Sequence, residues 1–172
     1  MSSMSTSGGD DIRDTGGSDF GNPDETLSQL DSFLRGEISA AETYRMAIDA
    51  VADSQQIPAI ANLEMLREIQ QEHGRAAQAL RERIRELGGK PSDSSGAWGV
   101  WARFTQGTAN LFGDLSALKS LKEGEEHGLK DYQEGADDVD AVSSELIRNQ
   151  LIPAQQRHIN LLDQLIRSVG TA

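Results

Sequence analysis

The sequence predicts an all-α protein, a four-helix bundle with one long crossover between its second and third helices. Four segments carry apolar residues at alternating spacings of three and four, the pattern of a helix that buries one face. Aromatic residues make up only 5% of the chain, so the core must consist mainly of Leu, Ile and Ala, which favours helices over strands. A length of 172 residues suits a single domain with a substantial core.

The charge and composition exclude several classes of partner. The formal net charge is -12, from 28 acidic and 16 basic residues, and a surface of that sign repels nucleic acid and anionic membranes. The chain has no cysteine, which excludes disulfides and thiolate metal sites. No apolar stretch approaches the length of a membrane span, and the N-terminal residues lack the pattern of a signal peptide. We therefore expect a soluble, cytoplasmic protein.

The N-terminal segment differs in composition from the rest of the chain. Residues 1–22 are rich in Ser, Gly and Asp, which predicts a disordered acidic tail, whereas residues 23–170 predict the bundle. The first helix begins with Asn22 as its capping residue and Pro23 at its first position, and its apolar stripe continues to Val51.

The second helix and the crossover come next. The helix begins near Pro58 and ends at the glycine pair Gly88 and Gly89, which is a strong stop signal. Residues 89–113 form the long connection, and its aromatic residues predict a short amphipathic helix lying across the bundle. These residues are Trp98, Trp101, Phe104 and Phe112.

Two further helices complete the bundle. The third begins at Asp114 or Ser116 and fades at Gly135. The fourth is predicted from about residue 139 to residue 169, and Pro153 should bend it or interrupt its hydrogen bonding because proline lacks a backbone N–H.

The two halves of the chain repeat the same polar motifs. Gly-Glu followed seven residues later by Tyr occurs in the first and third helices, and Gln-Gln-x-His occurs in the second and fourth. The Glu, Gln and His residues lie on the apolar stripes near the helix midpoints, so we expect these six to share one buried layer. A buried carboxylate costs several kcal/mol unless it pairs, binds a cation or reaches water. The repeated residues are Glu37, Tyr44, Gln70 and His73 in the first half and Glu125, Tyr132, Gln155 and His158 in the second.

The segments GEISAAETY and GEEHGLKDY, together with the paired Gln-x-x-His motifs, resemble the ferritin-like superfamily and, within it, a bacterial four-helix-bundle family of unknown function. The resemblance spans roughly residues 24–169 and implies a ferritin-like four-helix bundle, with a homodimer expected by the same analogy. It implies that Glu37 and Glu125 are terminal carboxylate ligands and that His73 and His158 are the histidine ligands. Where the superfamily has two metal-bridging glutamates, this chain has Gln70 and Gln155.

The two glutamines change the expected chemistry. Two carboxylates can neutralise one divalent cation, but two adjacent ions would repel each other strongly without an anionic bridge. We therefore expect no di-iron oxygen chemistry and at most one Fe, Zn or Mn ion, in a metal-handling or stress-related role. The expected ligands are Glu37, His73, Glu125 and His158, supported by Gln70, Gln155, Tyr44 and Tyr132.

Other functions remain open at this point. The layer could instead be a metal-free hydrogen-bond network in a non-enzymatic scaffold or partner-binding bundle, and an enzyme with a mononuclear centre is a third hypothesis. The sequence contains no GxSxG, HExxH or phosphate-binding glycine motif. Glu123 and Glu126 could replace Glu125 only if the third helix were rotated. The residues expected to be solvated are Glu42, Glu64, Glu72 and His127.

Overall fold

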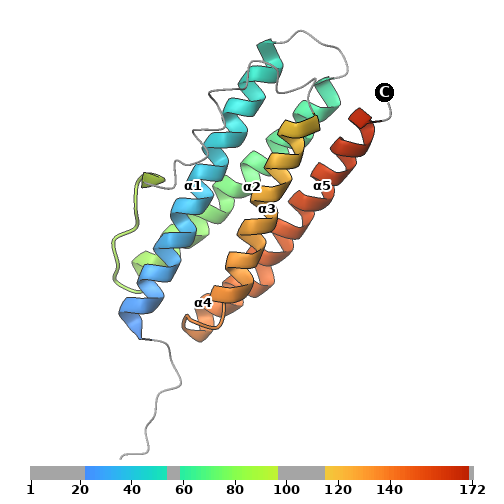
Figure 1. The fold of residues 1–172 in the computed structure, drawn as a ribbon. Helices are drawn as coiled ribbons and strands as arrows, with labels where there is room; N and C mark the ends of the chain where they lie inside the picture. The colour runs from blue at the N-terminus through green and yellow to red at the C-terminus, as the bar shows by residue number, and fades with distance from the viewer. Residues whose placement is uncertain (1–21, 54–58, 97–114, 171–172) are drawn as a thin grey trace, which may run out of the picture.

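The computed structural model describes residues 22–53, 59–96 and 115–170, and in these ranges it contains helices and no strand (Figure 1). The elements are α1 (Pro23–Asp53), α2 (Ala59–Glu86), α3 (Leu115–Gly135), α4 (Ala141–Leu146), the π-helical turn η2 (Ile147–Leu151) and α5 (Ile152–Gly170). Because α4, η2 and α5 follow one another without a gap, they form one rod, and the described ranges make a bundle of four rods. The all-α prediction is confirmed. The predicted tail up to residue 21 and the crossover aromatic residues lie outside the described residues.

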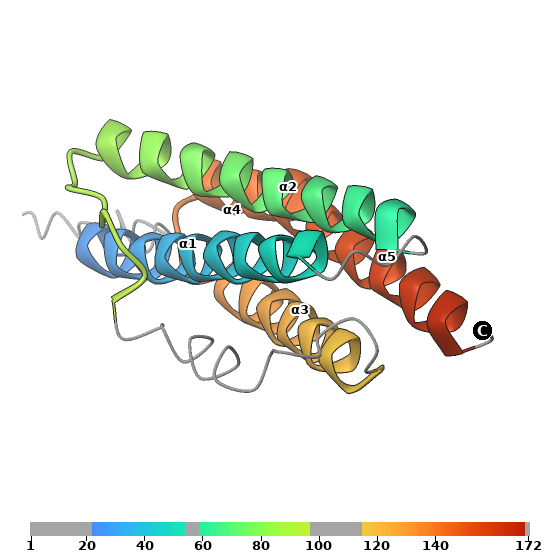
Figure 2. The same cartoon turned by 90° about the horizontal axis from the view of Figure 1, so that it is seen from above.

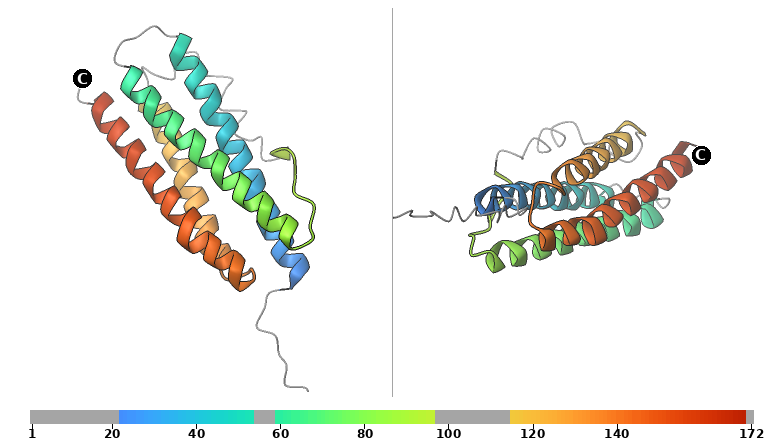
Figure 3. Two further views of the ribbon diagram at one scale, coloured as in Figure 1. Left: turned by 180° about the vertical axis from the view of Figure 1, so that it is seen from behind. Right: turned by 90° about the horizontal axis from the view of Figure 1, so that it is seen from below.

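The rods are arranged as two antiparallel pairs that lie side by side. α1 packs mainly against α2, and α3 packs mainly against the α4–η2–α5 rod. Figures 2 and 3 show the four rods from other sides. α2 and α3 point in the same direction, so the connection between them joins opposite ends of the bundle (Figure 1). This is the connectivity predicted from the sequence, two hairpins joined by one crossover.

The ends of the first hairpin follow the predicted signals. The Asn22 side chain accepts a hydrogen bond from the backbone N–H of Asp24 at 3.1 Å, which caps α1. At the end of α2, Gly88 has a φ of 78°, a conformation that glycine adopts without strain. The next N–H, that of Gly89, then bonds back to the Ile84 carbonyl at 2.9 Å and closes the helix.

The last rod begins slightly later than predicted and contains the predicted interruption. Asp140 is its N-cap and accepts from the N–H groups of Val142 and Ser143, so the helix begins at Ala141, slightly after the predicted start at about residue 139. The π-helical turn ends immediately before Ile152, whose N–H bonds to the carbonyl five residues back. A wider turn here accommodates the ring of Pro153, which cannot donate a backbone hydrogen bond.

The apolar core has two parts with a polar layer between them. One cluster is centred on residues such as Leu34 and Leu80, and the other on residues such as Leu66 and Leu162. Along every rod, the buried Glu, Gln or His stands between residues of one cluster and residues of the other. Among the helices of the described ranges, none has the length and apolar character needed to cross a membrane.

Candidate metal centre

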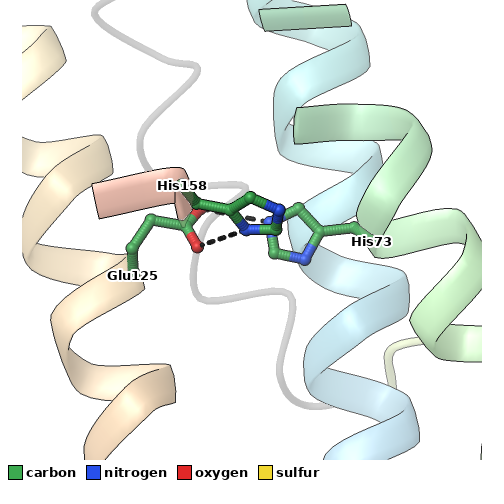
Figure 4. Close-up of side chains that lie close together, drawn as sticks. All are labelled: His73, Glu125 and His158. Atoms are coloured by element: carbon green, nitrogen blue, oxygen red, sulfur yellow. Dashed lines mark hydrogen bonds and ion pairs between the residues drawn. The ribbon is translucent and has the colours of Figure 1, made fainter. Parts of the chain in front are cut away.

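Five of the six polar side chains predicted to share a layer are at least nine-tenths buried. Their exposed fractions are 6% for Glu37, 2% for His73, 3% for Glu125, 4% for Gln155 and 2% for His158. Each lies on the apolar stripe of its helix, so packing of the rods carries it inward. Figure 4 shows the side chains from α2, α3 and α5 reaching toward one another at the centre of the bundle.

His73 lies between two carboxylates. Its Nδ1 is 2.7 Å from Glu37 Oε2, and its Nε2 is 3.1 Å from Glu125 Oε1. Burial alone would lower the pKa of His73, but the charges of Glu125 and Glu37 and their hydrogen bonds outweigh it and raise the pKa to about 10. Without a metal ion, His73 is therefore an imidazolium that pairs with both carboxylates.

Glu125 is the hub of the cluster. Its Oε1 also accepts from the Tyr44 hydroxyl at 2.6 Å, while its Oε2 accepts from Gln155 Nε2 at 2.5 Å and lies 3.2 Å from His158 Nδ1. Burial by itself raises the pKa of Glu125, but the charge of His73 and the hydrogen bonds from His158 and His73 hold the pKa well below its usual range. Glu125 is therefore ionised and available as a metal ligand.

The two tyrosines connect the halves of the repeat. Tyr44 on α1 donates to Glu125 on α3, and Tyr132 on α3 donates to Glu37 on α1. Burial, followed by the charge of the neighbouring Glu, raises the pKa of both hydroxyls well above 10.0, so both remain donors. Each tyrosine thus binds the glutamate of the other half, which explains why Glu and Tyr occur together in both copies.

Glu72 belongs to the site, and the expectation that it is a solvated charge was wrong. Its side chain is only 15% exposed, and its Oε2 lies 3.0 Å from His158 Nε2 and 2.9 Å from Arg157 Nη2. Burial alone would raise the pKa of Glu72, but the hydrogen bond from Arg157 and the interaction with His158 lower it. Glu72 was missed because it lies beside the apolar stripe of α2, where its long side chain reaches α5.

The two glutamines, by contrast, are not equivalent. Gln155 donates to the carboxylate and to the backbone carbonyl of Glu125, whereas Gln70 is only partly buried and bonds to none of the described cluster residues. Gln155 packs directly over Gly128, where a Cβ atom would stand 2.9 Å from the amide nitrogen. In the first half the residue at the equivalent position of the repeat is Ala40.

The remaining expectations about neighbouring residues hold. His127 is 65% exposed and pairs with Asp131 at 3.4 Å, so it stays on the surface. Glu123 and Glu126 are exposed, which shows that α3 is not rotated and that Glu125 is the inward carboxylate. Glu42 and Glu64 are exposed as well, and Glu42 accepts a hydrogen bond from Ser95 at 3.2 Å.

The close approach of Gln155 to Gly128 gives a testable expectation. We expect Gly128→Ala to lower the free energy of unfolding by about 1–2 kcal/mol, because the added methyl displaces a buried amide from its hydrogen bonds. Gly74→Ala is the matched control, since a Cβ there meets nothing within 4 Å, and it should stabilise by about 0.5–1 kcal/mol through helix propensity. Urea unfolding of both variants measures the difference, and equal stabilisation by both would contradict the close packing.

Three of these side chains lie close enough together that they could hold a metal ion. One ligand atom from each of His73, Glu125 and His158 can be chosen so that all lie within 4.8 Å of one another. Two imidazoles and one carboxylate suit Zn²⁺, Fe²⁺ or Mn²⁺ and leave further coordination positions open.

Comparison with known proteins places the chain in a family. Residues 25–138 match the family described as "Domain of unknown function (DUF2383)", which is more than half of the 172 residues. The match includes Glu37, His73 and Glu125 but ends before His158. Comparisons with curated proteins and with solved structures give no match. The chain therefore belongs to the DUF2383 family of domains of unknown function.

Proposed function

We propose that this protein binds one divalent cation, Fe²⁺, Zn²⁺ or Mn²⁺, at the centre of its bundle. The ligands are Nε2 of His73, the carboxylate of Glu125 and Nδ1 of His158. The observation that carries the proposal is that each histidine presents one ring nitrogen to Glu125 and the other to a second carboxylate.

The second carboxylates are Glu37 for His73, at 2.7 Å, and Glu72 for His158, at 3.0 Å. Histidines that bind metals usually donate their other N–H to a carboxylate, which fixes the ring and increases its basicity as a ligand. In this arrangement Glu37, expected from the sequence as a fourth ligand, supports His73 from the far ring nitrogen.

The charges around the cluster support one ion and disfavour two. The buried carboxylates of Glu37 and Glu125 supply two negative charges, which match one divalent cation with neutral histidines. The third carboxylate, Glu72, pairs with Arg157 and Arg75, so its charge is already balanced outside the core. A second ion would need an anionic bridge, and neutral Gln155 occupies one of the two bridging positions predicted from the sequence.

We further propose that the domain is a ferritin-like bundle in which a two-metal site has become a one-metal site. The internal repeat, the crossover between parallel α2 and α3, and Glu and His side chains facing one another across the rods all support this origin. A centre limited to one ion suits metal handling or a stress-related role better than iron storage.

The support of His158 by Glu72 provides the test. Glu72→Gln is expected to weaken Zn²⁺ binding by about 10–100-fold, because neutral Gln is a weaker acceptor for the imidazole N–H. Competition against a chromophoric chelator measures the affinity, with exposed Glu64→Gln on the same helix as the control. Equal affinity of the two variants would remove Glu72 from the site, and a native chain that takes up no Zn²⁺ would refute the proposed function.

A second candidate function has its own supporting observation. Both oxygens of Glu37 and both oxygens of Glu125 have partners among the described side chains, so the cluster is also satisfied as a metal-free network. Such a layer would specify the packing of a scaffold or partner-binding bundle. Under this alternative, added Zn²⁺ leaves the unfolding temperature unchanged, whereas a metal that binds only the folded state raises it.

A further inference from the structure

A cavity of about 380 Å³ lies between α1 and α3 and extends to the buried cluster. The side chains that line its inner end include Glu37, His73 and Glu125. Tyr44 and Tyr132, which donate to the two carboxylates, also line it. The α1/α3 cavity therefore connects the candidate metal centre with the face of the bundle between these two helices.

Several small residues line the α1/α3 cavity. They include Gly36 and Ala40 on α1 and Gly124 and Gly128 on α3. A Cβ atom at Gly36 would meet nothing within 4 Å, so neither close packing nor an unusual φ requires glycine there. Glycine destabilises a helix interior relative to alanine, so its presence at position 36 needs another reason. An unobstructed path past α1 provides one.

The charge along the cavity favours cations. Asp131, Glu134 and Asp138 on and just after α3 line it on the outer side, and its described lining contains no Lys or Arg. Glu134 pairs with the exposed Lys130 at 3.6 Å, and Asp131 pairs with His127. A cleft lined by one sign of charge attracts ions of the opposite sign and raises their rate of entry.

We propose that the α1/α3 cavity is the passage through which a divalent cation reaches the buried cluster. The three outer carboxylates attract the ion, and the absent side chain at Gly36 leaves the path open to Glu37 and Glu125. This inference rests on the proposed function, because it concerns the route to the same site.

The test compares two helical glycines, one that lines the cavity and one that does not. Gly36 and Gly74 both lie inside helices with open space at the Cβ position, but only Gly36 lines the cavity. Co²⁺ is the probe, and its visible absorption in a protein site reports uptake in a stopped-flow experiment. Gly36→Leu is expected to slow uptake about tenfold or more, because entry then requires local opening of the bundle. Gly74→Leu is expected to take up Co²⁺ at the native rate, and equal rates in the two variants would overturn the passage.

A second comparison tests the charges without altering the cavity walls. The triple variant Asp131→Asn, Glu134→Gln, Asp138→Asn is expected to take up Co²⁺ about 3–10-fold more slowly at low salt, with the difference lost at high salt. The control triple variant, with the same change in net charge at exposed positions outside the cavity lining, is Glu64→Gln, Glu68→Gln, Glu145→Gln.

The outcomes separate the two proposals. A native chain that binds no Co²⁺ would refute the proposed function itself. Stoichiometric binding with the same rate in the cavity variants and in their controls would overturn the passage alone. Slower uptake in both cavity variants, with native rates in both controls, supports the passage.

Discussion

Replacing His73 by leucine is expected to lower the free energy of unfolding of the metal-free protein by about 3–5 kcal/mol. The substitution leaves the carboxylates of Glu37 and Glu125 in the core without the imidazolium that pairs with both at 2.7 and 3.1 Å. Removing one partner of a buried ion pair leaves an uncompensated charge, which is far more destabilising than losing a surface contact. Urea unfolding followed by circular dichroism in the presence of a chelator measures the change.

Two further variants test whether the loss of stability comes from the unpaired carboxylates and not from replacing a histidine as such. His127→Leu makes the same chemical change at an exposed site and is expected to alter stability by less than about 0.5 kcal/mol. Adding Glu37→Gln and Glu125→Gln to His73→Leu should restore much of the stability, since no charge is then left buried. If His73→Leu were no more destabilising than His127→Leu, the paired imidazolium would not be part of the structure.

The second large effect is a dependence of stability on pH in the metal-free protein. The pKa of His73 is raised to about 10 in the folded state, from an ordinary value near 6.5. Because the folded state holds this proton more tightly, the contribution of His73 is complete below about pH 6.5 and is lost as the pH rises through about 10. The loss is expected to be on the order of 3–5 kcal/mol across that interval.

Glu125 has the opposite dependence. Its pKa is held below the usual range, so its contribution is present above the pKa of an unfolded Glu, about 4.3, and is lost as the pH falls. The measurement is the difference in unfolding free energy between the native chain and His73→Leu from acid to alkaline pH. A difference that stays constant between about pH 6.5 and 10 would contradict the ionised pairing of His73.

Much of this fold could be predicted because local signals and burial agree. The capping Asn22, the stop at Gly88 and the inward stripes each depend on a few neighbouring residues, and the structure follows them. The interruption before Pro153 was predictable for the same reason, since the missing N–H is a property of proline itself. The last rod begins slightly later than predicted because Asp140 caps it. The sequence alone does not show which of several nearby polar residues acts as the cap.

The cluster was largely predictable from the internal repeat. Glu37, His73, Glu125, Gln155 and His158 lie on apolar stripes at the same height, and the structure brings all five together. The repeat identified them because a polar residue at a core position in both halves is difficult to explain by chance.

Contacts between rods were harder to predict. Glu72 lies off its stripe, and its contact with His158 depends on how α2 and α5 sit against each other. When the two copies of the repeat are aligned, Glu72 and Arg157 occupy equivalent positions. Their opposite charges were the sequence signal available for a contact between these positions. The unequal roles of Gln70 and Gln155 also depend on packing between rods, such as the approach of Gln155 to Gly128, which periodicity does not show.

The proposed site holds one divalent cation between His73, Glu125 and His158. Anomalous X-ray diffraction from crystals of the native chain equilibrated with Zn²⁺ locates such an ion directly. We expect one strong anomalous peak per chain, within about 2.0–2.2 Å of His73 Nε2, His158 Nδ1 and a carboxylate oxygen of Glu125. No peak between these residues, or two peaks there, would contradict it.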